Sequence, residues 1–135
     1  MGAWGHRNFE NDSAMDFVGD FLESPTETAL SDALAIVIDV SAEEEYIEVE
    51  EASAALAAAE MVAAANGRGS SDFPQELSAL LKKTGFVPNE KLMKKARKAV
   101  SVVLKESELQ ELWAESGEPN EWQDVQIDLL ARLSK

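Results

Sequence analysis

Hydrophobic positions recur at helical spacing along most of the chain. In the first such segment they fall at i, i+3, i+4, i+7 and i+8, which places them on one face of a helix. Acidic side chains occupy the opposite face. Asn11 or Asp12 precedes this pattern, and a short side-chain oxygen there can accept hydrogen bonds from the amides of the first turn. The pattern predicts a helix with an inner stripe of Ala14, Phe17, Val18, Phe21 and Leu22.

A second helix is expected to begin at Ser24. Ser24 and Glu27 have the spacing of a capping box, and Pro25 would occupy the first helical position. The sequence around Val37 would also suit a strand, but the length of the apolar pattern favours a helix. Its predicted buried face is Leu30, Ala33, Leu34 and Val37.

The segment around Tyr46 is ambiguous, because it can continue the second helix or form a short extended link. We expect the link, with a new helix from about Glu50. Nine of the fourteen residues from 52 to 65 are alanine, the strongest helix former and a small one, so this helix can be buried centrally with close neighbours. Asn66 and Gly67 should end it, as a left-handed cap would.

Four further helix starts follow. The predicted capping or starting residues are Asp72, Asn89, Ser107 and Asn120, and Gly85 should end the helix that Asp72 begins. All connections are short. The sequence therefore predicts an all-α compact bundle of six or seven helices, formed by residues 1–135 as a single helical domain.

The N-terminal block carries aromatic residues close to glycines. Trp4 lies between Ala3 and Gly5, and a large apolar side chain in this setting predicts a tail anchored onto one end of the bundle. The two later tryptophans lie on apolar helical faces and are expected in the core rather than in a ligand cage. We predict a structural role for Gly2, Trp4, Gly5, Phe9, Asn11, Trp113 and Trp122.

Composition narrows the functional classes. The formal net charge is −14, so neither nucleic acid nor an anionic membrane is an expected partner, since both are bound through basic surfaces. The chain has no cysteine, no apolar run long enough to span a membrane and no hydrophobic leader at its start. We therefore expect a cytoplasmic protein.

The charge is segregated along the chain. Residues 10–60 contain fifteen acids and no lysine or arginine, whereas eight of the twelve bases lie in residues 82–105. These charges could pair across the bundle or remain as solvated faces, or the acids could form a docking surface for a basic protein partner. The candidate partner-binding residues are Asp12, Asp16, Asp20, Glu43, Glu44, Glu48 and Glu51.

The chain offers little for catalysis. His6 is the only histidine, and no phosphate-binding, dinucleotide-binding or nucleophile-elbow motif occurs. Carboxylates at helical spacing could hold magnesium, and Asp16, Glu48 and Glu51 are the best set. However, the acids lie opposite the apolar stripes and should face water. We predict no catalytic residue, no metal site and no cofactor.

The opening Met1 to Gly5 and the later residues 107–115 (Ser-Glu-Leu-Gln-Glu-Leu-Trp-Ala-Glu) resemble an uncharacterised bacterial family, domain of unknown function 4259. The alanine-rich segment, Trp122 and the closing residues 130–133 are also similar. The resemblance implies a small cytosolic bacterial protein with one helical domain. It implies no activity, cofactor or catalytic residue.

Three functional classes remain open. The leading prediction is a protein-binding module, immunity-like or inhibitory, whose acidic face covers a basic partner. The second is a structural or regulatory domain without a fixed ligand. The third is a magnesium-dependent all-α hydrolase that uses the carboxylates named above.

Overall fold

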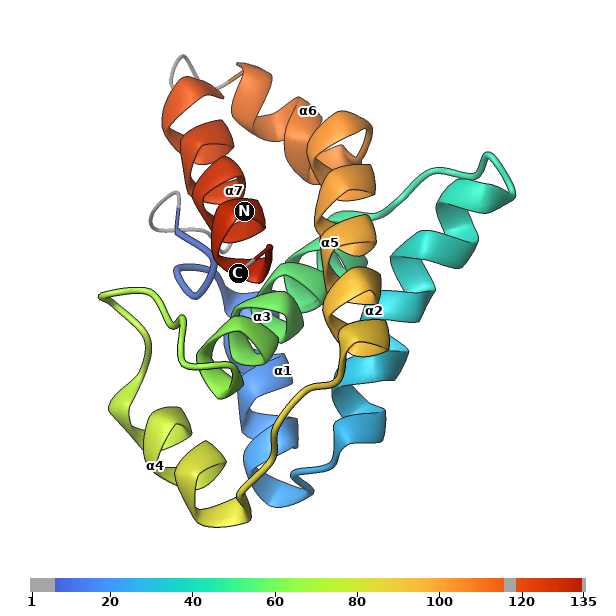
Figure 1. Ribbon diagram of the computed structural model, residues 1–135. Coiled ribbons are helices and arrows are strands. Elements are labelled where there is room, and N and C mark those ends of the chain that lie inside the picture. The colour runs from blue at the N-terminus through green and yellow to red at the C-terminus, as the bar shows by residue number, and fades with distance from the viewer. Residues whose placement is uncertain (1–6, 116–118, 135) are drawn as a thin grey trace.

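The structure, a computed structural model, describes residues 7–115 and 119–134, and it is all-α (Figure 1). The described residues contain seven helices and no strand, which confirms the predicted helical bundle. No helix among them is long and apolar enough to cross a membrane. The predicted anchor residues Gly2, Trp4 and Gly5, together with His6, lie outside the described residues. The helices are α1 (Asp12–Glu23), α2 (Glu27–Ala42), α3 (Val49–Ala65), α4 (Gln75–Thr84), α5 (Glu90–Lys105), α6 (Glu108–Glu115) and α7 (Pro119–Leu133).

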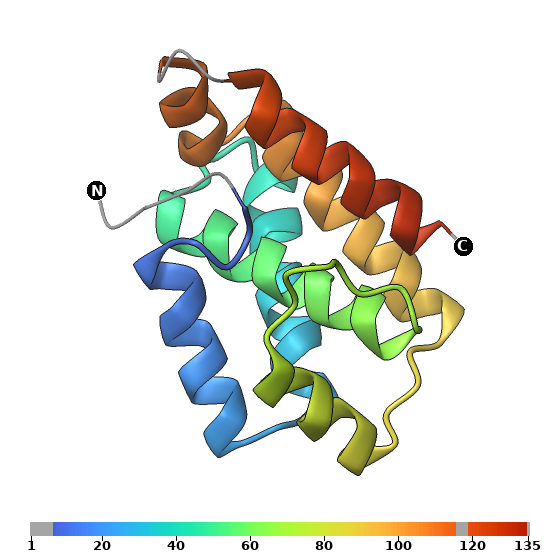
Figure 2. The ribbon, with the colours of Figure 1, turned by 90° about the vertical axis from the view of Figure 1, so that its left-hand side faces the viewer.

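The alanine-rich helix α3 lies at the centre of the molecule and contacts each of the other six helices. Most of its residues are buried, including a run of nine from Ala55 to Ala63. Small side chains allow neighbouring helices to approach α3 on several sides, as the sequence predicted. Helices α1 and α5 lie on opposite sides of α3 (Figure 2). Gly67, at φ +79°, follows the C-cap residue Asn66 and supplies the left-handed backbone that was expected there.

One apolar core joins all seven helices. Phe9 from the N-terminal segment is buried in it and makes an edge-to-face contact with Phe73, with ring centroids 5.6 Å apart. Trp122 is almost fully buried, and Trp113 is half-buried against the core. Trp122 therefore lies in the core and Trp113 against it, in line with their apolar helical faces, and Phe9 is a core residue of the N-terminal segment. Asn11 caps α1 as predicted, because its side-chain oxygen accepts a hydrogen bond from the Ala14 amide at 2.8 Å.

Three predicted helix starts were wrong. Helix α2 is capped by Thr26, whose hydroxyl accepts from the Ala29 amide at 3.1 Å, while Ser24 ends α1 instead. The Ser24 amide donates to the Asp20 and Phe21 carbonyls, so this residue belongs to the end of α1. Helix α4 follows Pro74 without a side-chain cap, so Asp72 does not cap it. Helix α7 begins at Pro119, which places Asn120 inside the first turn.

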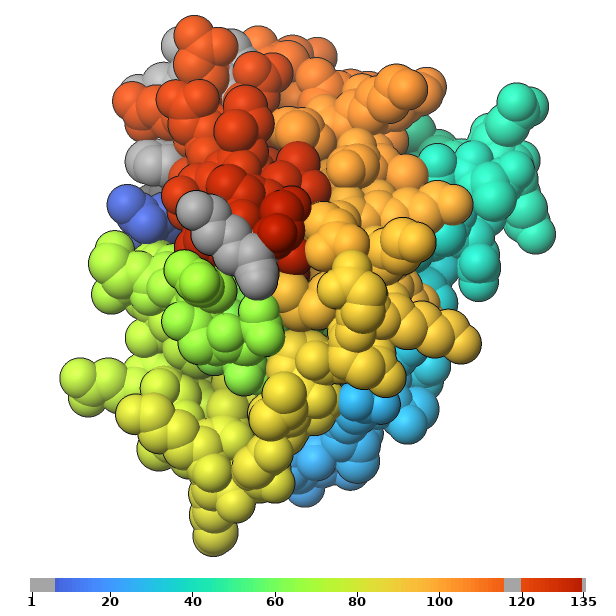
Figure 3. Space-filling model, viewed as in Figure 1, coloured from blue at the N-terminus to red at the C-terminus, as the bar shows by residue number. Residues whose placement is uncertain are grey.

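The link between α2 and α3 is extended, and the new helix starts at Val49, close to the predicted Glu50. The end of α2 and this link project from the body of the molecule (Figure 3). Ile47 points inward and is buried, whereas the neighbouring Tyr46 is exposed. The Glu108 amide donates to the Ile47 carbonyl at 2.9 Å, which attaches the start of α6 to the link.

Candidate functional site

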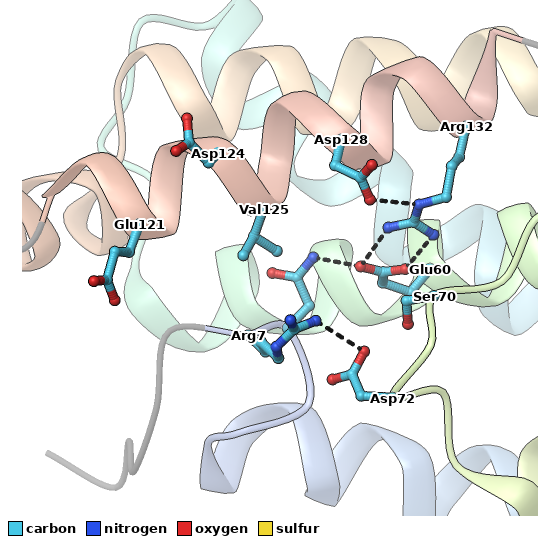
Figure 4. Close-up of a pocket in the computed structure, with 10 residues that line it drawn as sticks. Arg7, Glu60, Ser70, Asp72, Glu121, Asp124, Val125, Asp128 and Arg132 are labelled. Carbon is cyan, nitrogen blue, oxygen red and sulfur yellow. Dashed lines mark hydrogen bonds and ion pairs between the residues drawn. The ribbon is translucent and has the colours of Figure 1, made fainter.

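A polar pocket of about 340 Å³ lies between the N-terminal segment, α3, α7 and the loop that joins α3 to α4 (Figure 4). It is the place where residues far apart in the sequence bring charged groups together. Arg7 and Asn8 come from the N-terminal segment, Glu60 from the middle of α3, and Asp72 from the loop. Helix α7 contributes a row at helical spacing, namely Glu121, Asp124, Val125, Asp128 and Arg132.

Glu60 is the centre of this pocket, and it is only 2% exposed. A carboxylate removed from water needs charged or hydrogen-bonding partners, because burial of an unpaired charge is very costly. Arg132 supplies a two-point contact: its guanidinium donates to Oε1 at 2.9 Å and to Oε2 at 3.2 Å. The Asn8 amide also donates to Oε2, at 2.9 Å. Both oxygens of Glu60 are therefore occupied by donors, which suits a structural role better than proton transfer.

Asn8 and Gln126 are the second layer of the cluster, and both are buried. Their side-chain amides exchange two hydrogen bonds: Gln126 donates to Asn8 at 2.8 Å, and Asn8 donates to Gln126 at 3.0 Å. The same Asn8 nitrogen thus serves Gln126 and Glu60. This arrangement ties the N-terminal segment to both α3 and α7.

Arg132 completes the cluster at the rim of the pocket. It also donates to Asp128 at 2.8 Å and to the Arg68 carbonyl at 3.1 Å. Burial alone would lower the pKa of Arg132, but hydrogen bonding and charge from Glu60, and then from Asp128, raise the pKa above its ordinary value. The guanidinium is consequently a permanent cation shared by two carboxylates.

The outer wall of the pocket carries an excess of negative charge. Arg7 pairs with Asp72 at 3.4 Å in an exposed contact. Asp124 is exposed and faces the same hollow from α7. The Ser70 hydroxyl is buried and has no hydrogen-bond partner among the described residues. Five carboxylates and two guanidinium groups line the pocket, so its field would repel an anion.

The predicted partner-binding residues lie elsewhere, on the surface. Asp12, Asp16 and Asp20 project from α1 and are exposed, as expected from their position opposite the apolar stripe. Helix α6 adds exposed acids at Glu111 and Glu115. We call the surface formed by α1, the α2–α3 link, the first turn of α3 and α6 the acidic face. Its other predicted members are Glu43, Glu44 and Glu48, which are exposed, and Glu51, which is half-buried.

Glu51 has a structural task as well. Its carboxylate accepts a hydrogen bond from the Glu48 amide at 3.3 Å, which is half of a capping box at the start of α3. Asp16 lies on the other helix, α1. Within the described parts of the chain, no three acidic or histidine side chains are grouped so that they could hold a metal ion. The set proposed for a magnesium-dependent hydrolase is therefore not assembled as a site.

Tyr46 marks the edge of the acidic face, where the α2–α3 link meets α6. Its hydroxyl donates to the Glu111 carboxylate at 3.3 Å, and the side chain is 55% exposed. Local desolvation and then the charge and hydrogen bond of Glu111 raise the pKa of Tyr46, with smaller effects from Glu108 and Glu115. The link and α6 thus present one continuous negative surface.

The acidic face has no basic counterpart among the described residues. The ion pairs there join Arg7 to Asp72, Arg97 to Glu90, and Arg132 to Glu60 and Asp128. None of them involves an acid of α1, of the α2–α3 link or of α6. Within residues 7–115 and 119–134, no ion pair therefore joins an acid of this face to the bases of residues 82–105.

Sequence reasoning missed the buried cluster of Asn8, Glu60, Gln126 and Arg132. One signal was present: Glu60 is the only charged residue in the alanine-rich run from 52 to 65. A lone carboxylate on a helix predicted to be buried on several sides requires a cation from another element. No local pattern indicates which arginine that would be.

The fold and the buried cluster define a small all-α protein of strongly acidic character, in which a carboxylate–arginine pair joins α3 to α7. The chain belongs to the family described as domain of unknown function (DUF4259), whose model matches residues 2–125. No curated protein and no solved structure matches the chain.

Proposed function

We propose that this protein is a binding module that docks a basic protein partner on its acidic face. The observation that carries the proposal is that no ion pair within the described residues involves an acid of that face. Exposed like charges repel one another, and a cationic partner relieves the repulsion while it binds. Complementary charge also speeds encounter and selects among partners. An immunity-like or inhibitory role, in which the face covers a basic partner, is the most concrete form.

The arrangement of the helices supports a one-sided interaction. The lysines at positions 91, 94 and 98 are exposed on α5. Helix α5 lies across α3 from α1, so these cations cannot neutralise the aspartates of α1 (Figure 2). The protein is therefore electrically asymmetric despite its large negative charge. A basic partner would be steered to one side of the molecule.

A polylysine peptide titrated into the protein tests the proposal by calorimetry. We expect binding that weakens as sodium chloride is raised, because screening removes the attraction. The triple variant Asp12→Asn, Asp16→Asn, Asp20→Asn should lose most of the affinity. The matched control is Glu27→Gln, Asp32→Asn, Asp39→Asn, which removes three exposed charges from α2.

The control triple should retain most of the binding. Equal losses of polylysine affinity in the two triple variants would mean that only the net charge matters. That result would contradict docking on the acidic face. Absence of salt-dependent binding in the unmodified protein would contradict the proposal directly.

A further inference from the structure

A second, smaller pocket opens on the acidic face where α1, α3 and α6 meet. Its volume is about 80 Å³. At a share of about 30 Å³ per water molecule, this is room for two or three waters, far below the several hundred cubic ångströms of a usual cofactor pocket. The apolar side chains that line it are Val49, Leu109, Leu112 and Trp113.

Two carboxylates, Asp12 and Glu50, line the same pocket, and both side chains are exposed. Leu109, by contrast, is buried, and the other three apolar side chains are half-buried. The pocket therefore has an apolar side, formed mainly by α6, and a polar side at the start of α1, where Asn11 and Ser13 flank Asp12, while α3 adds Val49, Glu50 and Ser53. Neither carboxylate takes part in an ion pair within the described residues.

The walls of this pocket are fixed by hydrogen bonds. The Glu108 carboxylate accepts from the Val49 amide at 2.9 Å and so holds the start of α6 against the start of α3. The Asn11 side chain accepts from the Ala14 amide in the first turn of α1. These contacts also occupy amides that an anion would otherwise seek at a helix start. An anionic occupant is thus opposed both by the filled amides and by the two carboxylates.

We infer that this pocket holds a single lysine or arginine side chain of the basic partner. Such side chains lay a methylene stem along apolar surface and keep the cationic end at a polar edge. Trp113 offers the aromatic ring that attracts a cation most strongly, and Asp12 and Glu50 can receive the charged end. Binding energy in interfaces concentrates in pockets that receive such anchor side chains, and this one combines an aromatic wall with two carboxylates.

This inference rests on the proposed function, and its test separates the two. The probes are N-acetyl-arginine amide, N-acetyl-lysine amide and the neutral isostere N-acetyl-citrulline amide. The signal is the indole N–H resonance of Trp113, assigned by its loss in Trp113→Phe. We expect saturable shifts of this resonance with the arginine and lysine probes and none with citrulline amide.

Charge variants locate the site. Asp12→Asn and Glu50→Gln should each weaken binding of the cationic probes about two- to five-fold, the range expected for one exposed ionic or cation–π contact. The matched controls Glu27→Gln and Asp32→Asn each remove one exposed charge from α2, outside the pocket and outside the acidic face, and they should leave the affinity unchanged.

Two results would overturn the inference: equal shifts with citrulline amide, or equal losses in the pocket variants and the controls. If polylysine binds the acidic face while the Trp113 resonance does not respond to the cationic probes, the inference fails and the proposed function stands. If polylysine does not bind, the proposed function fails on its own test.

Discussion

Asn8 and Gln126 are 118 positions apart in sequence, yet their buried side-chain amides exchange two hydrogen bonds, of 2.8 and 3.0 Å. Asn8 also donates to Glu60 at 2.9 Å. Through this one side chain the N-terminal segment is joined to the central helix α3 and to the last helix α7. The contact explains how a short segment without regular structure at residues 7–10 can bury Phe9 beside it.

Replacement of Asn8 should destabilise the protein strongly. Asn8→Ala removes hydrogen bonds from the buried side chains of Glu60 and Gln126. Leaving these polar groups unsatisfied should lower the free energy of unfolding by about 1–3 kcal/mol. Asn8→Asp should cost more at neutral pH, because it places a second carboxylate against Glu60. Chemical denaturation measures both, and Asn120→Asp, an exposed control, should stay within about 0.5 kcal/mol of the wild type.

The stability lost in Asn8→Asp should depend on pH, and it should be smaller at lower pH. Repulsion by Glu60 would raise the pKa of the introduced carboxyl in the folded state above the unfolded value of about 3.9. The folded protein then binds more protons, so its relative stability falls as the pH rises through this range. The difference in free energy of unfolding between Asn8→Asp and the wild type should narrow as the pH is lowered from neutral. A gap independent of pH would contradict the contact with Glu60.

Removal of Arg132 should expose the cost of a buried charge. In Arg132→Met, Glu60 remains almost fully buried without its cation, which predicts a loss of about 3–5 kcal/mol. The double variant Arg132→Met, Glu60→Leu should lose less than Arg132→Met alone, since no unpaired charge remains. Arg7→Met is the control, because the exposed Arg7–Asp72 pair should contribute about 0–1 kcal/mol. A larger loss in the double variant would show that the pair itself is strongly stabilising.

The alanines of α3 should not tolerate larger side chains. Ala58 is fully buried, so Ala58→Leu must displace neighbouring helices and should cost about 1–3 kcal/mol. Ala79 is exposed on α4, and Ala79→Leu should change the stability by less than about 0.5 kcal/mol. Thermal or denaturant unfolding distinguishes the two. Equal stabilities would mean that the packing around α3 is loose.

The unpaired acidic face predicts the effect of salt on the free protein. Repulsion among its acids destabilises the fold, and screening should relieve it as the Debye length falls to roughly 10 Å at 0.1 M salt. The melting temperature should therefore rise by a few degrees between low and moderate sodium chloride. A decrease would indicate that stabilising ion pairs dominate and would remove the physical motive for the proposed docking.

Tyr46 provides a spectroscopic test of the same face, because it is the only tyrosine in the chain. Its raised pKa means that the folded protein holds the phenol proton more tightly than the unfolded chain. The stability that this group contributes is therefore lost as the pH rises above 10.0, the ordinary pKa of a tyrosine. In a phenolate absorbance titration, Glu111→Gln should lower the pKa of Tyr46, whereas Glu23→Gln, on α1, should leave it unchanged.

The sequence by itself determined where the helices lie. The apolar stripes of α1 and α5, the cap at Asn11 and the left-handed glycine at Gly85 depend on residues within a few positions of one another, so local patterns predict them. The central place of α3 also followed from its alanine content. Ser24 and Thr26 both carry a hydroxyl that can cap a helix, and the local pattern wrongly favoured Ser24, whereas the structure places the cap at Thr26.

Only the tertiary structure decided which charges meet. The partner of Glu60 lies 72 positions away at Arg132, and the contact exists because α7 packs across α3 with those two side chains facing each other. The acidic face likewise depends on how α6 is held over the start of α3, and on α5 lying on the other side of the molecule from α1. Helical periodicity fixes which face of each helix is polar. The distance between polar faces of different helices depends on packing, which no local pattern records.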